Sequence, residues 1–108
     1  MSDAPRPRTW TFLTNHGHVL VCIAANPEMR ISEIADLVGI GERAAHAIVN
    51  DLVEAGYVAR TKIGRRNRYA VNRNMPLRHP LERDHEIGEL LGALAPVDTA
   101  ARRRAAGT

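Results

Sequence analysis

The feature that most constrains the fold is a tight turn, Gly39-Ile40-Gly41, with an apolar helical pattern on each side of it. Apolar residues after the turn recur at positions i, i+3, i+4 and i+7, which predicts a helix over residues 42–55 with one buried stripe. The stripe consists of Ala45, Ile48, Val49 and Leu52. Gly56 follows the stripe, and glycine is common just past the C-terminus of a helix. The chain is therefore expected to hold two helices joined by a tight turn.

The segment before the turn carries two apolar helical patterns. The first predicts a helix over about residues 15–25, which Thr14 or Asn15 can cap with a side-chain oxygen. A short extended piece is expected at residues 29–31. Ser32 is then expected to cap the helix that leads into the turn.

Two runs rich in β-branched and aromatic residues follow the turn and its second helix. They predict strands over residues 57–61 and 68–71, joined by a loop over residues 62–67. Gly64 and Asn67 are typical of such a turn. The pair of strands is expected to form a β-hairpin.

A last helix is expected over about residues 84–95. Its apolar stripe consists of Ile87, Leu90, Leu91 and Leu94. The stripe can close the core of one chain or pack against a second copy. Because about 80 ordered residues bury little surface alone, we expect these four residues to form a homodimer interface, assisted by the first helix, Trp10 and Phe12.

These elements together predict a mainly α fold with a small β-hairpin, an α+β arrangement in the order α-β-α-α-β-β-α. This is the order of a winged helix-turn-helix, with the hairpin as the wing. The domain is expected over residues 13–75, followed by a connector and dimerisation helix over 76–96. A flexible arm over residues 1–12 and a disordered tail over 97–108 are expected to flank it.

Charge is distributed unevenly along the chain. The acids exceed the bases between Glu28 and Ala59, whereas the segment from Arg60 to Arg83 has eight basic residues and one acid, Glu82. A basic segment beside an acidic one favours a surface that binds a polyanion. The single cysteine, Cys22, excludes an internal disulfide, and we expect a cytoplasmic protein without a membrane span.

Double-stranded DNA is the polyanion that this arrangement fits best. Arg and Asn are suited to bidentate contacts with guanine and adenine, and basic side chains on a wing can contact phosphates. On the outer face of helix 42–55, the expected DNA contacts are Arg43, His46, Ala47 and Asn50. On the wing, the expected contacts are Lys62, Arg65, Arg66, Asn67 and Arg68.

The segments 31–58 and 59–71 resemble the helix-turn-helix and wing of bacterial regulators of the MarR and ArsR type. The most specific parts are Leu-x-x-Ala-Gly-Tyr-Val, ending at Val58, and Gly-Arg-Arg-Asn-x-Tyr, ending at Tyr69. The resemblance implies a homodimeric transcriptional regulator that reads an inverted repeat. Relatives usually have Ser or Thr where Gly41 stands, and Glu42 and Glu54 add negative charge near the DNA groove. We therefore expect the wing to lead binding.

Three other functions are alternatives to DNA binding. No catalytic motif is present, and no histidine or cysteine pair has the spacing of metal ligands, so we expect no enzyme activity, cofactor or metal. A winged helix can also serve as a protein-interaction module whose wing binds an acidic partner. A small-molecule effector, or a metal-responsive repressor, stays open as a further alternative.

Overall fold

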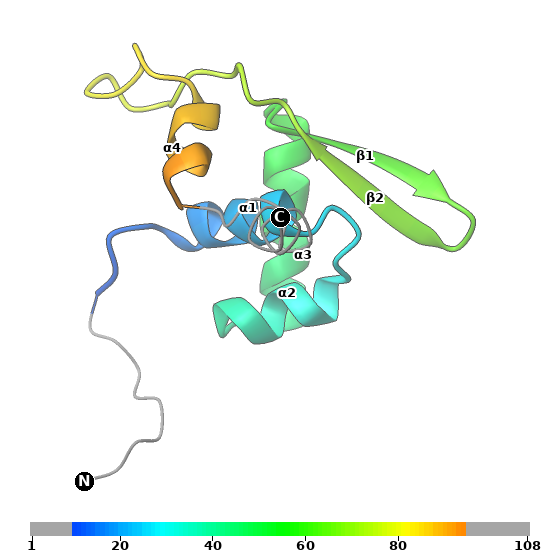
Figure 1. The fold of residues 1–108 in the computed structure, drawn as a ribbon. Coiled ribbons are helices and arrows are strands. Elements are labelled where there is room, and N and C mark those ends of the chain that lie inside the picture. The colour runs from blue at the N-terminus through cyan, green and yellow to red at the C-terminus, as the bar shows by residue number, and fades with distance from the viewer. Residues whose placement is uncertain (1–9, 95–108) are drawn as a thin grey trace, which may run out of the picture.

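The computed structural model describes residues 10–94 and confirms the predicted fold class, a mainly α winged helix (Figure 1). The elements are α1 (Asn15–Ala25), α2 (Ile31–Val38), α3 (Glu42–Glu54), β1 (Val58–Ile63), β2 (Arg66–Val71) and α4 (Ile87–Leu94). Most of the expected arm and all of the expected tail lie outside the described residues. Within residues 10–94, no helix is long and apolar enough to cross a membrane.

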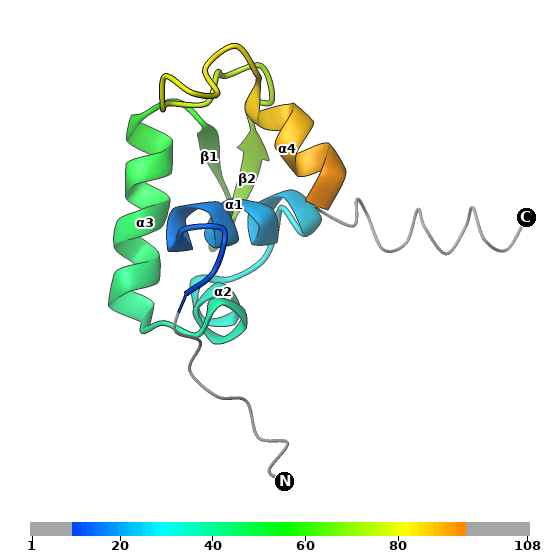
Figure 2. The same cartoon turned by 90° about the vertical axis from the view of Figure 1, so that its left-hand side faces the viewer.

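The core is formed where α1, α2 and α3 meet, with β2 and α4 also in contact with α1 (Figure 2). All four residues of the predicted α3 stripe are buried, as are Val19, Leu20 and Ile23 of α1. Thr14 caps α1 as predicted, because its hydroxyl oxygen accepts a hydrogen bond from the Gly17 N–H at 3.2 Å. The periodicity of the sequence therefore predicted both helices correctly.

The hairpin is longer than predicted, and its loop is shorter. β1 and β2 pair antiparallel with Val58 opposite Val71 and Ile63 opposite Arg66, which leaves only Gly64 and Arg65 in the turn. Gly64 has a φ of 64°, while no non-glycine residue described has a positive φ. A left-handed residue at the first central position is the pattern of a type II′ turn, which matches the twist of a hairpin. The predicted turn role of Asn67 was therefore wrong.

The expected strand at residues 29–31 is not formed. A turn closes between Met29 N–H and Asn26 O, and α2 already begins at Ile31. A single backbone bond, from Tyr69 N–H to Pro27 O, joins this loop to the edge of β2. The loop therefore lies beside the hairpin without adding a third strand.

The cap of α2 also differs from the prediction, because Ser32 lies inside the helix and Arg30 is the N-cap residue. The Glu33 carboxylate accepts a hydrogen bond from the Arg30 N–H at 2.8 Å. An arginine side chain has no acceptor, so only this half of a capping box can form. Glu33, rather than a serine hydroxyl, satisfies the backbone at this end.

α4 begins at Ile87, three residues later than predicted. Residues 80–84 instead form turns, closed by bonds from Glu82 N–H to His79 O and from His85 N–H to Glu82 O. A bridge between Pro76 and Glu86 and a bond from Ile87 N–H to Met75 O at 2.7 Å follow. A Cβ on Gly88 would come within 2.9 Å of Arg73 O, so this close approach needs glycine. Backbone hydrogen bonds therefore join the chain at Met75 and Pro76 to the start of α4.

Candidate nucleic-acid interface

The outer face of α3 carries the four predicted DNA-contacting residues. Burial of the opposite stripe fixes the rotation of the helix, and it leaves Arg43, His46 and Ala47 exposed and Asn50 partly exposed. These four lie on one side of the helix, away from the core. α3 begins after Gly41, which makes no side-chain cap bond.

Arg60 joins the wing to this helix face. Its Nη1 donates to Oδ1 of Asn50 at 3.0 Å. A bidentate contact with adenine uses the Asn oxygen as acceptor and the Asn amide as donor. The oxygen has two lone pairs, so Asn50 keeps one acceptor site and both amide donors for a base edge while it accepts from Arg60.

Sequence reasoning missed the role of Arg60 because the residue stands in the basic run without a distinguishing motif. The signal lies in the strand register. Arg60 is directly opposite Tyr69 and two residues after Val58, both of which are buried. Because side chains alternate along a strand, Arg60 lies on the body side of the hairpin and can reach α3.

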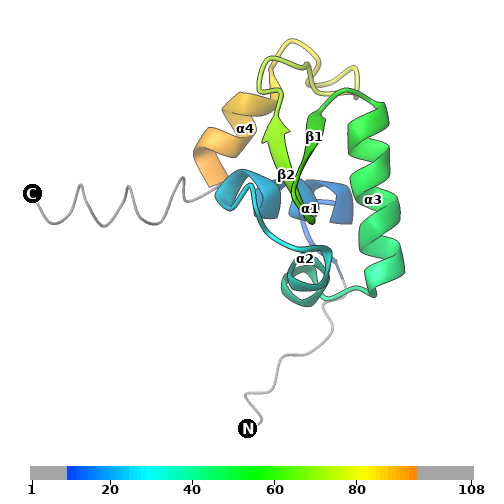
Figure 3. The ribbon, with the colours of Figure 1, turned by 90° about the vertical axis from the view of Figure 1, so that its right-hand side faces the viewer.

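The predicted wing residues lie on both faces of the hairpin and at its tip. Lys62 and Asn67 are paired and share the face of Arg60, whereas Arg66 and Arg68 belong to the opposite face. Arg65 lies in the turn, at the end that projects from the helices (Figures 1 and 3). All five are exposed. They do not form one continuous surface, so a single flat contact with DNA cannot use all of them.

Glu28 contacts Arg66 and Arg68, the two arginines on the face of the hairpin opposite Arg60. Arg66 Nη2 donates to the backbone oxygen of Glu28 at 3.2 Å, and Arg68 Nη1 lies 4.0 Å from the Glu28 carboxylate. Both partners of the ion pair are more than half exposed, and such pairs contribute only about 0–1 kcal/mol. No pattern in the sequence predicts this contact, because Glu28 is 38 residues from Arg66.

A family comparison adds to this geometry. The model of the MarR family matches residues 11–68, which is more than half of the chain and runs from the segment before α1 into β2. The chain belongs to the MarR family. Membership implies a DNA-binding transcriptional regulator, and regulators of this family are generally not enzymes. No curated protein and no solved structure gave a match.

The stripe expected at the dimer interface of this MarR-family chain is divided by the structure. Ile87 and Leu91 are buried in the core of the single chain. Leu90 is partly exposed, and Leu94 is 46% exposed. Only these last two are accessible to a partner without unpacking α4.

The titratable groups with shifted pKa values lie away from α3 and the wing. The hydrogen bond that His85 donates to the Glu89 carboxylate raises the pKa of His85. The backbone N–H of Glu86, together with His85, lowers the pKa of Glu89. Burial raises the pKa of the Cys22 thiol, which disfavours the reactive thiolate. Within residues 10–94, no group of three His, Cys, Asp or Glu side chains is placed to hold a metal ion.

Proposed function

We propose that this MarR-family protein is a homodimeric transcriptional regulator that binds double-stranded DNA sequence-specifically. α3 enters the major groove, and the wing follows the neighbouring backbone or minor groove. The observation that carries the proposal is the hydrogen bond from Arg60 to Asn50, because it joins the wing to the outer face of α3. A helix and a hairpin held together in this way present one surface to a duplex.

The base contacts come from α3. Arg43 can donate two hydrogen bonds to a guanine edge, and His46 can donate or accept one. Ala47 offers a methyl group that can pack against the methyl group of thymine. Asn50 can donate to a base and accept from it while its oxygen also accepts from Arg60. Sequence preference therefore depends on three side chains with hydrogen-bonding capacity and one small apolar side chain.

The phosphate contacts come from the wing. Lys62 and Asn67 continue the face of Arg60, and Arg65 extends from the tip. Arg66 and Arg68 lie on the opposite face of the hairpin, where Glu28 competes with a phosphate for their donors. Phosphate contacts carry most of the affinity in such complexes, so the wing leads binding and α3 selects the site.

The homodimer places one such surface on each half of an inverted repeat. Dimeric helix-turn-helix proteins bind half-sites about 34–36 Å apart, which is one turn of the duplex. In this chain, Leu90 and Leu94 are the members of the α4 stripe that remain accessible to a second copy.

Selection of bound sequences from a random duplex pool tests the proposal directly. We expect an inverted repeat, and we expect the logarithm of the binding constant to fall linearly with the logarithm of salt concentration, by about 0.9 per phosphate contact. Arg65→Ala should weaken binding to all sequences and reduce the slope, whereas Arg43→Ala should relax the sequence preference. Arg83→Ala removes an exposed arginine of the connector and serves as the control. A flat salt response together with binding to an acidic protein would instead support the interaction module.

A further inference from the structure

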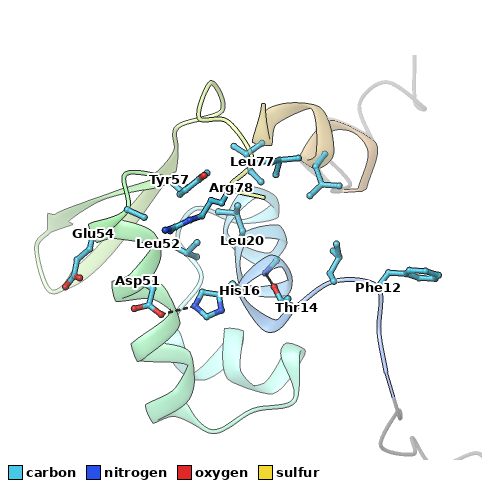
Figure 4. Close-up of a pocket in the computed structure, with 15 residues that line it drawn as sticks. Phe12, Thr14, His16, Leu20, Asp51, Leu52, Glu54, Tyr57, Leu77 and Arg78 are labelled. Atoms are coloured by element: carbon cyan, nitrogen blue, oxygen red, sulfur yellow. Dashed lines mark hydrogen bonds and ion pairs between the residues drawn. The ribbon is translucent and has the colours of Figure 1, made fainter. Parts of the chain in front are cut away.

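An apolar groove opens on the side of the molecule opposite the wing tip. It lies between α1, the end of α3, the connector and α4, and its volume is about 650 Å³ (Figure 4). Its walls are mainly apolar and include Leu13, Leu20, Leu52, Tyr57, Leu77 and Leu90. Its charged lining residues are Asp51 and Glu54 of α3 and Arg78 of the connector, and Asp51 pairs with His16 at 2.8 Å. The groove is therefore apolar within, with two carboxylates on the α3 side and one arginine on the connector side.

The segment just before α1 carries aromatic and basic side chains that complement the groove. Trp10 and Phe12 are 67% and 92% exposed, and their rings meet edge to face with centroids 5.0 Å apart. The sequence before them contains Arg6 and Arg8. An exposed aromatic pair beside basic residues is typical of a segment that docks on a partner rather than one that remains in water.

This segment does not fill the groove of its own chain. Leu13 and Thr14 form an edge of the groove, and Phe12 lies at its outer end with the ring directed away from the other lining residues (Figure 4). To enter the groove, the segment would have to reverse its direction immediately before the Thr14 cap of α1. The groove is open to another molecule.

We propose that the groove binds the Trp10–Phe12 segment of a second copy of this chain, and that each copy of the homodimer receives the segment of the other. The proposal rests on the homodimer of the proposed function and identifies its contact. Two chemical features support it. The aromatic rings match the apolar walls, and the positive charges of Arg6 and Arg8 match the two carboxylates of the α3 side, which outnumber the one arginine of the connector side.

The geometry and the area fit a reciprocal contact. Each segment leaves from the edge of its own groove, so a two-fold axis that turns the grooves toward each other brings each segment beside the groove of the partner. The two segments contribute four aromatic side chains, each burying about 150–250 Å². With the groove walls added, the area approaches the about 1,200–2,000 Å² of specific interfaces.

Trp10 is the single tryptophan, so its fluorescence reports the position of this segment alone. Across a dilution series of the full chain, we expect the emission to shift to shorter wavelength as sedimentation shows the dimer forming. Phe12→Ser should weaken dimerisation at least tenfold. Leu81→Ser removes a side chain that is 86% exposed and does not line the groove, so it should leave dimerisation unchanged.

Each contrary result has a distinct meaning. A shifted emission in the monomer would overturn the proposal, because the segment would occupy the groove of its own chain. A dimer with unshifted emission, or one that Phe12→Ser leaves intact, would also overturn it while leaving the DNA-binding homodimer in place. A chain that stays monomeric at every concentration would overturn both the segment exchange and the homodimer.

Cross-linking between two differently labelled copies provides an independent test. In a Cys22→Ser background, Thr11→Cys chains, which keep Trp10 and Phe12, are mixed with Leu77→Cys chains. Under mild oxidation they should form a disulfide-linked pair, because a disulfide needs Cα atoms within about 7 Å. Leu81→Cys in place of Leu77→Cys is the control. Equal yields from the two mixtures would contradict docking in the groove.

Discussion

The wing side and the groove side of this molecule are built by opposite means. On the wing side, exposed polar and charged side chains make isolated contacts, such as the hydrogen bond from Arg60 to Asn50 and the ion pair of Arg68 with Glu28. On the groove side, buried aliphatic side chains attach α4 to α1, and the open surface is apolar. Exposed polar contacts contribute little to stability, whereas apolar burial contributes much. Stability and DNA binding are therefore expected to depend on different sides of the molecule.

α3 is the element that the two sides share. Arg43, His46 and Asn50 lie on its outer face, while Asp51 and Glu54 line the groove. A helix is rigid over this length, so a shift of α3 moves both its outer face and the groove wall. The substitutions below separate the two contributions, beginning with the largest expected effect.

Leu91→Ala should destabilise the chain most. Leu91 is fully buried at the contact between α4 and the core, and such truncations cost about 2–5 kcal/mol. Leu94→Ala, at a position that is 46% exposed, should cost much less. Denaturant unfolding at fixed protein concentration measures both. Equal costs would show that α4 is held by a partner chain rather than by its own core.

The sequence predictions were correct where the contacting residues are close together in the sequence, and wrong where they are far apart. The α3 stripe and the Thr14 cap depend on residues within a few positions of one another, and both were predicted correctly. The hairpin register was wrong because Gly64 and Asn67 are both common in turns, and strand pairing decides between them. Ile87 and Leu91 were assigned to a dimer interface because periodicity identifies an apolar face without identifying what covers it.

The second prediction concerns the bond between wing and helix. Asn50→Ala and Arg60→Ala should each reduce affinity for the preferred DNA site, by about 1–3 kcal/mol where a base contact is lost. Because the two side chains are bonded, the double variant should lose less than the sum of the single losses, with a coupling of about 0.5–3 kcal/mol. Equilibrium binding to one duplex measures this cycle. Strict additivity would mean that the two residues act independently on DNA.

The third prediction concerns Glu28, which should oppose DNA binding. Its carboxylate lies 4.0 Å from Arg68, so its negative charge repels a phosphate that approaches that arginine. Glu28→Gln keeps the backbone oxygen that accepts from Arg66 and removes the negative charge. The free energy of DNA binding should therefore improve by up to about 1 kcal/mol, and this gain should be larger at low salt. Glu42→Gln removes an acid at the start of α3 and distinguishes this local effect from net charge. Equal gains from both variants would argue against a specific role for Glu28.

The smallest effect is expected at the His85–Glu89 pair, and it should appear in stability rather than in DNA binding. The raised pKa of His85 means that its contribution is complete below the ordinary histidine value of 6.5 and is lost as pH rises through the raised value. The lowered pKa of Glu89 means that its contribution is present above the ordinary glutamate value of 4.5 and is lost as pH falls through the lowered value. The pair therefore stabilises the fold most between these limits.

His85→Gln removes the titration while keeping a polar side chain, so the unfolding midpoint of the wild type should exceed that of the variant most near pH 5–6. The difference should shrink as the pH rises above the raised pKa of His85. A difference at His85 that stays constant with pH would show that the imidazole acts by packing against α4 rather than by its charge.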